Sequence, residues 1–130
     1  MERTDYNRDE GLHRRETARL IGSDKVEGTD VYSMSGDRIG RIERIMIDKV
    51  SGKVAYAVLS FGGFLGIGED HYPIPWSKLT YDEELDGYRT DIEKSRLEDA
   101  PRYRADEYDT FDREREQGIY TYYGVPPYWI

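Results

Sequence analysis

The chain has 130 residues, room for one domain of ordinary size, and its 37% apolar and 35% charged residues exclude a large core built from the whole chain. The absence of cysteine excludes a disulfide scaffold, a thiol nucleophile and any cysteine-ligated metal centre. The net charge of −8, with no basic stripe longer than the pair Arg14-Arg15, disfavours binding to nucleic acid, because phosphates repel acidic surfaces.

The first 19 residues contain five acidic and five basic side chains and almost no apolar periodicity, which predicts a charged N-terminal arm. They also lack the basic-then-apolar order of a signal peptide. The longest run of apolar residues other than glycine, 54–59, is far shorter than the ~20 residues that cross a bilayer. We therefore expect a cytoplasmic protein with no transmembrane segment.

Short runs rich in valine, isoleucine and tyrosine alternate with glycine-containing turns between residues 28 and 90. This spacing predicts short antiparallel strands joined by tight turns, which together form a small β-barrel. The expected strands cover residues 30–33, 38–48, 54–61, 71–74, 80–81 and 88–90, and a short turn or 3₁₀ segment covers residues 76–79.

The isoleucines of the long strand at 38–48 fall into two parities, with Ile42 opposite to the others, which predicts a bulge or bend between residues 41 and 44. The strand at 54–61 is apolar on both faces, which predicts a central strand covered on both sides. The expected core consists of Val31, Ile39, Ile45, Ile47, Val54, Tyr56, Val58, Leu59, Ile74 and Leu79.

The pattern changes after the last expected strand. Asp91 can cap a short helix at 92–97, and a second, acidic helix is expected at 109–117. Residues 118–130 hold five aromatic side chains. We expect this tail to be irregular, because it also contains Gly124, Pro126 and Pro127.

No arrangement of residues points to catalysis. The glycine-rich stretch at 62–68 is followed by Glu69 and Asp70, whose charges would repel a bound phosphate, and a strand rather than a helix comes next. Glu69, Asp70 and His71 alternate between the two faces of a strand and do not converge on a metal ion. We therefore expect no enzyme activity, no cofactor and no metal site.

Two aromatic or apolar clusters are candidates for a protein interface. One is the tip of the glycine-rich hairpin, and the other is the C-terminal tail, since rings with a polar edge serve cores and interfaces equally well. Each can pack on the chain's own barrel or on a second copy or partner, and the sequence leaves both alternatives open. The candidate interface residues are Phe64, Leu65, Ile67, Tyr120, Tyr122, Tyr123, Tyr128 and Trp129.

The order of motifs between residues 26 and 90 resembles the PRC-barrel domain. The matching stretches are GTDVY at 28–32, SGDRIGRI at 35–42, IMID at 45–48, SGKV at 51–54, AVLSFGGFLGIG at 57–68 and YPIPW at 72–76. The tail, with EDAP at 98–101 and PYW at 127–129, is similar to that of small stand-alone bacterial members. This resemblance divides the chain into an arm at 1–19, a barrel at 20–97 and an extension at 98–130.

The resemblance implies a small β-barrel that binds other macromolecules without catalysis. It is found in the H subunit of the photosynthetic reaction centre, which has a transmembrane helix that residues 1–19 cannot form. It is also found in the ribosome-maturation factor RimM, whose additional barrel domain nineteen residues cannot hold. We expect a non-enzymatic adaptor that acts through protein contacts as a homo-oligomer, with a dimer favoured. The alternatives are a factor associated with RNA or ribosome assembly and an accessory protein related to the H subunit.

The acidic balance makes a direct prediction for the RNA alternative. A mobility-shift assay is expected to show weak or no binding of RNA at physiological salt. Sub-micromolar affinity that falls steeply with added salt would contradict the protein-contact interpretation.

Overall fold

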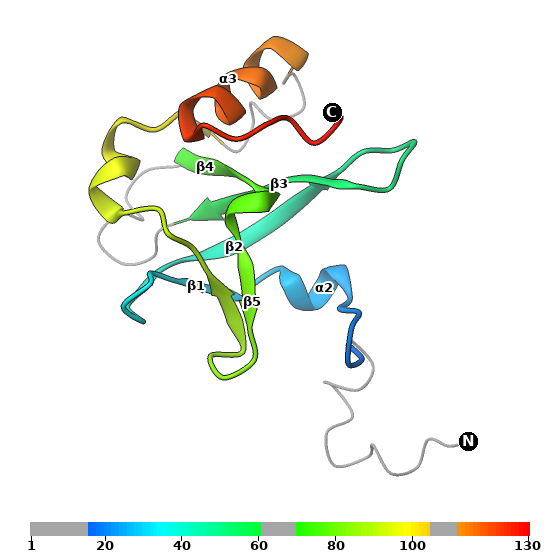
Figure 1. Ribbon diagram of the computed structural model, residues 1–130, viewed down its shortest axis with the longest axis vertical. Coiled ribbons are helices and arrows are strands. Elements are labelled where there is room, and N and C mark those ends of the chain that lie inside the picture. Colours follow the sequence, from blue (N-terminus) through cyan, green and yellow to red (C-terminus); the bar gives the residue numbers. More distant parts are fainter. Residues whose placement is uncertain (1–15, 61–69, 105–111) are drawn as a thin grey trace.

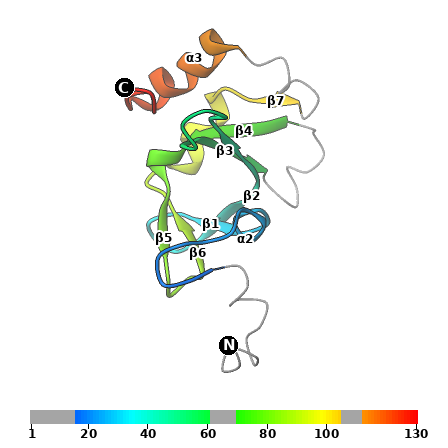
Figure 2. The ribbon, with the colours of Figure 1, turned by 90° about the vertical axis from the view of Figure 1, so that its right-hand side faces the viewer.

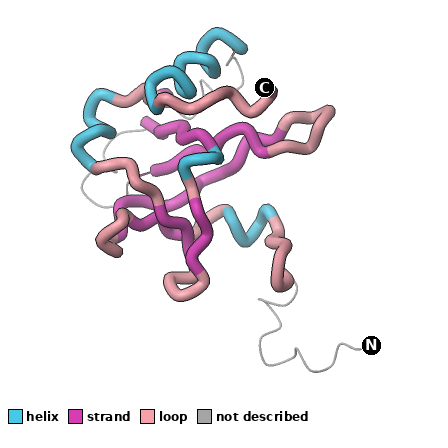
Figure 3. Tube along the Cα trace, in the orientation of Figure 1, coloured by secondary structure: helices cyan, strands magenta, loops and turns pink. Residues whose placement is uncertain are grey.

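The computed structural model describes residues 16–60, 70–104 and 112–130 (Figure 1). Figure 3 shows strands through the middle of the molecule, with the helical segments around them. In chain order the elements are α2 (Ser23–Val26), β1 (Asp30–Tyr32), β2 (Arg38–Ile47), β3 (Val54–Ser60), β4 (Asp70–Pro75), η3 (Trp76–Lys78), β5 (Thr80–Asp82), β6 (Gly87–Arg89), η4 (Lys94–Asp99), β7 (Tyr103–Arg104) and α3 (Arg113–Tyr123).

The seven strands form one sheet in the order β5-β6-β1-β2-β3-β4-β7. Neighbouring strands are antiparallel except β1 and β6, which run parallel. The predicted all-antiparallel barrel is therefore corrected to a mixed sheet, and within the described residues no ladder joins β5 to β7 to close it. The parallel pair arises because η3 carries the chain from β4 to the other end of the sheet, where the β5–β6 hairpin meets β1 (Figure 1, Figure 2).

Gly87 allows β6 to approach β1 closely. A Cβ atom at this position would lie 2.7 Å from the carbonyl oxygen of Asp30 and 3.0 Å from the ring of Tyr32. Side-chain carbons do not come this close to backbone oxygens, so any larger residue would force the two strands apart. The parallel pairing therefore depends on a glycine at the start of β6.

The bulge predicted in the long strand is confirmed, because the register between β2 and β3 shifts between Ile42 and Arg44. Ile39 and Ile42 both lie in the core despite their opposite parity, because the register between β1 and β2 also shifts, between Val31 and Tyr32, which leaves Ile39 as an extra residue on β2. A second shift lies between Met46 and Ile47, near the end of the strand. The expectation that Ile47 belongs to the core is wrong, since beyond this shift its side chain is 49% exposed.

Strand β3 is buried on both faces, as predicted from its apolar run. Ala57 and Leu59 belong to the main core, which also holds Ile42 and Ile74. Ala55, Tyr56 and Val58 form a second cluster, against which three partly buried side chains pack: Met46, Tyr103 and Tyr128. Of the other expected core residues, Val31, Ile39 and Leu79 are buried, whereas Ile45 and Val54 are half-buried.

The helix predicted at 92–97 is instead the 3₁₀ helix η4, preceded by Glu93 without a side-chain cap. Asp91 does not cap it, because its carboxylate pairs with Lys78 at 2.8 Å. The two-residue strand β7, which pairs with β4, and the one-turn helix α2 were not predicted. Both are too short to produce a periodic pattern.

The helix predicted at 109–117 begins at Arg113, after Asp112, whose carboxylate accepts the backbone N–H of Arg115. It continues to Tyr123, so the expectation that the tail is irregular from residue 118 is wrong. Helix α3 runs through the exposed Gly118 because the next turns bury aromatic and apolar side chains on one face. It ends at Gly124, where φ is 70°, a left-handed conformation that favours glycine.

Substitutions of two isoleucines in β2 test the register that the bulge sets. Ile42→Ala is expected to lower the free energy of unfolding by about 2–5 kcal/mol, because it leaves a cavity in the core. Ile47→Ala, its matched control on the same strand, is expected to change it by less than about 1 kcal/mol. Urea unfolding measures both values, and equal losses for the two variants would contradict the register described here.

Candidate interaction surface

The C-terminal segment packs along the outside of β3 and β4 rather than extending into solvent (Figure 1). Tyr120 is 1% exposed, and its hydroxyl lies 2.8 Å from a carboxylate oxygen of Glu116 and 3.3 Å from the carbonyl oxygen of Ala55. Burial, and then the hydrogen bond to Glu116, raise the pKa of this hydroxyl well above its ordinary value. Tyr120 is thus a core residue that remains neutral and acts as a hydrogen-bond donor.

Helix α3 is also held against η4 by Tyr122 and Arg96. The Tyr122 hydroxyl donates to the carbonyl oxygen of Arg96 at 2.6 Å, and the Arg96 guanidinium donates to the carbonyl oxygen of Tyr122. The guanidinium carbon lies 4.7 Å from the centroid of the Tyr122 ring, within the range of a cation–π interaction. Tyr123 is buried beside them in the main core. Both tyrosines therefore serve the packing of the helix.

The last residues of the chain are fixed to the β2–β3 hairpin. The Tyr128 hydroxyl donates to the carboxylate of Asp48, which also accepts the backbone N–H groups of Val50 and Ser51. The N–H of Ser51 first, then Tyr128 and Val50, lower the pKa of Asp48 from 3.8 to about 2. One ionised carboxylate therefore holds both the hairpin turn and the tail.

Trp129 stands at the outer end of this arrangement. Its ring meets Tyr120 and Tyr128 edge-on, with centroids 5.5 Å and 5.3 Å away, and the Arg113 guanidinium lies 3.8 Å from its centroid. Such edge-to-face contacts fix the orientation of a ring that is still partly exposed.

Four apolar side chains are exposed around this junction of hairpin and tail. Val50 is 97% exposed at the hairpin turn, Ile130 is 86% exposed at the end of the chain, and Ile47 and Trp129 are exposed to smaller extents. A cavity of about 170 Å³ lies between the two segments and is lined by Ile47 and Tyr128 among others. We refer to Ile47, Val50, Trp129 and Ile130 as the hairpin–tail surface.

The structure separates the expected interface residues into three groups. Tyr120 and Tyr123 are buried in the chain's own core, and Tyr122 is half-buried against η4. Tyr128 and Trp129 lie at the hairpin–tail junction. The residues that lie outside the described part of the chain are Phe64, Leu65 and Ile67.

Sequence reasoning missed three members of the hairpin–tail surface. Val50 has a visible signal, since it is the one apolar residue in the polar turn at 48–53. The sequence signal of Ile47 is misleading, because its position in the alternating pattern matches that of the core residue Ile39. Nothing in the sequence distinguishes Ile130 from an ordinary chain end.

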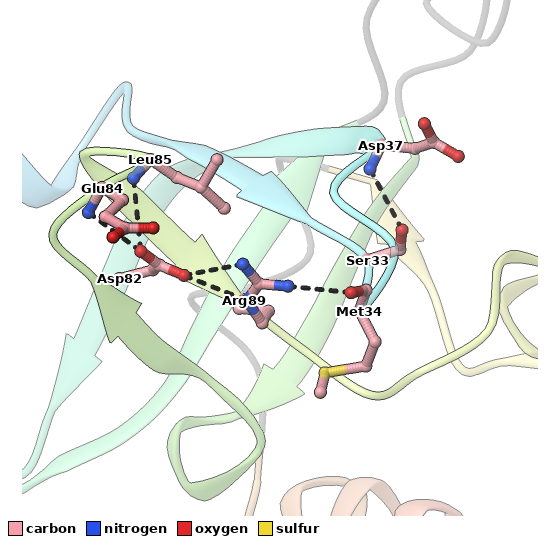
Figure 4. A network of polar contacts seen from close by, with 7 residues as sticks. All are labelled: Ser33, Met34, Asp37, Asp82, Glu84, Leu85 and Arg89. Carbon is pink, nitrogen blue, oxygen red and sulfur yellow. Dashed lines mark hydrogen bonds and ion pairs between the residues drawn. The ribbon is translucent and has the colours of Figure 1, made fainter.

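A polar network joins the β5–β6 hairpin to the turn at Met34 (Figure 4). The Arg89 guanidinium donates to Asp82 at 2.7 Å and 3.1 Å and to the carbonyl oxygen of Met34 at 2.8 Å. Asp82 also accepts the N–H groups of Glu84 and Leu85, and its pKa is lowered, chiefly by Arg89. The charges of Asp82 and Arg89 are satisfied by these partners. The network therefore fixes the β5–β6 turn and the turn at Met34.

Within residues 16–60, 70–104 and 112–130, no three acidic or histidine side chains lie close enough together to hold a metal ion. In the same ranges no helix has the length and apolarity needed to cross a membrane.

The bond between Tyr128 and Asp48 makes the position of the tail measurable. Tyr128→Phe removes one donor, so the pKa of Asp48 is expected to rise from about 2, while the N–H groups of Ser51 and Val50 keep it below 3.8. Because the folded pKa is lowered, the contribution of this carboxylate to stability is present above pH 3.8 and is lost as the pH falls through about 2. Carboxyl NMR titration measures the shift. Tyr122→Phe is the control, and it is expected to leave the pKa of Asp48 unchanged. If Tyr128→Phe also left this pKa unchanged, the tail would not be bound to the hairpin.

The comparisons with known proteins agree with this architecture. An uncharacterized protein of Deinococcus radiodurans is 24% identical over 80 residues, a match that covers 62% of this chain but only 28% of that protein. A family model, the PRC-barrel domain, matches residues 19–97, from the segment before α2 into η4. Because this match covers more than half of the sequence, the chain belongs to the PRC-barrel domain family.

Proposed function

We propose that this chain is a non-enzymatic adaptor that binds a protein partner through the hairpin–tail surface. PRC-barrel domains mediate protein interactions, which supports the general class of function. The observation that carries the specific proposal is the exposure of four apolar side chains on two segments that the Tyr128–Asp48 hydrogen bond holds together. Exposed apolar groups held in a fixed arrangement are typical of recognition surfaces.

The surface is preorganised for binding. Trp129 is oriented by its contacts with Tyr120, Tyr128 and Arg113 before any partner arrives. A fixed aromatic ring loses little side-chain entropy on association, which is why tryptophan is frequent among the residues that dominate binding energy. The charged groups of Asp48 and Arg113 lie beside the apolar side chains, where they form a polar rim.

We propose a second copy of the chain as the partner. A barrel of ~65–80 residues buries only about 60% of the surface of its unfolded chain and gains stability from additional apolar contacts. Here the extension at 98–130 supplies part of that contact within one chain, through Tyr120 and Tyr123. The hairpin–tail surface remains exposed after this packing, and a symmetric dimer would cover it.

Substitutions that introduce a negative charge test the surface. Val50→Asp and Ile130→Asp are each expected to raise the dissociation constant of the dimer at least about tenfold, because a carboxylate would have to be desolvated in the interface. Met34→Asp is the matched control, since Met34 is 60% exposed on a different part of the molecule. Light scattering coupled to gel filtration measures the mass over a range of concentrations.

The fold must be unchanged for this comparison, and circular dichroism establishes that. A wild-type protein that remains a monomer at every concentration would contradict the dimer. If the Val50→Asp and Ile130→Asp variants dimerised as tightly as the Met34→Asp control, association would use another surface.

A further inference from the structure

A cavity of about 360 Å³ lies far from the hairpin–tail surface, between the segment at 16–21 and the β5–β6 hairpin. In Figure 2 this segment is the dark blue loop below β5 and β6. The volume is within the range of sites that hold small organic ligands. Its lining combines aromatic rings with carboxylates, and no part of the proposed adaptor function uses it.

Three rings form the apolar walls. Tyr88 is 3% exposed and lies between Trp76 and Tyr81. The Trp76 and Tyr88 centroids are 5.4 Å apart with planes inclined by 59°, and the Tyr81 and Tyr88 centroids are 5.3 Å apart with planes inclined by 68°. The three rings pack on one another and together line one side of the cavity, and the faces of aromatic rings attract cations.

The charges around the rings leave one carboxylate in excess. Lys25 Nζ lies 3.4 Å from Glu16 and 3.3 Å from Asp86, and Arg19 and Glu83 also line the cavity. Of these charged residues Glu16, Glu83 and Arg19 line the cavity, two acidic groups against one basic group, and Lys25 and Asp86 stand behind them. The Oε1 atom of Glu16 is the one that pairs with Lys25, and this buried atom accepts no hydrogen bond from any described residue. The Tyr81 hydroxyl donates to Asp86 at 2.9 Å, which fixes that ring in its place.

We propose that this cavity binds a small organic cation with an alkylammonium group, held against the aromatic lining and attracted by the carboxylates of Glu16 and Glu83. A methylated ammonium fits because its charge is spread over an apolar surface that rings can contact, and it does not need the full hydrogen bonding of a metal or a primary amine. An anion would meet the excess carboxylate. A neutral apolar ligand would gain nothing from the excess negative charge.

The electrostatic environment agrees with this choice. The pKa of the Tyr88 hydroxyl is raised, first by burial and then by the negative charge of Glu16. The Glu16 carboxylate therefore lies close enough to affect Tyr88, one of the rings that line the cavity. The net charge of −8 also attracts cations to the molecule as a whole.

Choline is the probe, and its uncharged carbon analogue dimethylbutanol is the control of equal shape. The chain contains two tryptophans, so the indole N–H signals of Trp76 and Trp129 report on the cavity and on a distant site in one NMR experiment. We expect choline to shift the Trp76 signal saturably with a dissociation constant of about 1 mM, while the Trp129 signal stays in place. Dimethylbutanol is expected to bind at least about tenfold more weakly.

Glu16→Gln keeps the shape of the side chain and removes its charge. It is expected to weaken choline binding at least about fivefold, whereas the control Glu84→Gln, in the β5–β6 turn but outside the cavity lining, leaves it unchanged. A peptide with trimethyllysine is titrated separately, to distinguish a free compound from a modified protein side chain as the ligand. Binding of choline or of the peptide that is stronger than binding of dimethylbutanol supports the site. No shift of Trp76 with either ligand, or equal binding of choline and dimethylbutanol, would overturn the proposal.

Discussion

Strand β3 has apolar side chains on both faces, and the rest of the molecule is arranged to cover them. Ala57 and Leu59 are covered by the main core, which the bulge of β2 completes with Ile42. Tyr56 and Val58 point the other way and require a second layer. That layer comes from beyond the sequence stretch that matches the family, through Tyr103 and Tyr128. The C-terminal extension is therefore a part of the folded unit.

The hairpin–tail surface follows from this requirement. Once Tyr120 is buried and Tyr128 is bound to Asp48, the two residues that end the chain are placed beside an exposed hairpin turn. The tail thus covers one apolar face of the sheet, and together with the hairpin it exposes a smaller apolar surface to the solvent. The cavity at the opposite end has a separate origin, in the loop at 16–21 and the rings of the β5–β6 hairpin, so the two proposed sites can be altered independently.

Features governed by neighbouring residues could be predicted from the sequence. The isoleucine spacing revealed the bulge, and the apolar run revealed the two-faced strand. The parallel pairing of β1 and β6 could not be predicted, because it depends on a close contact between Gly87 and Asp30, which are distant in the chain. The continuation of α3 through Gly118 was also hidden, since tertiary packing of Ile119, Tyr120 and Tyr123 overrides the low helix propensity of glycine. Composition alone could not separate the buried Tyr120 from the exposed Trp129, because both rings suit a core or an interface.

The measurement that tests the account most directly is hydrogen exchange at the amides of β3 in the full chain and in a chain that ends at residue 119. Removing residues 120–130 deletes the buried ring of Tyr120 and the contact of Tyr128 with the second cluster. Loss of an aromatic side chain from a core costs about 3–5 kcal/mol, so the account predicts a lower midpoint of thermal unfolding and faster exchange throughout β3. Unchanged exchange in β3 together with an unchanged midpoint would show that the extension is not required to cover the sheet.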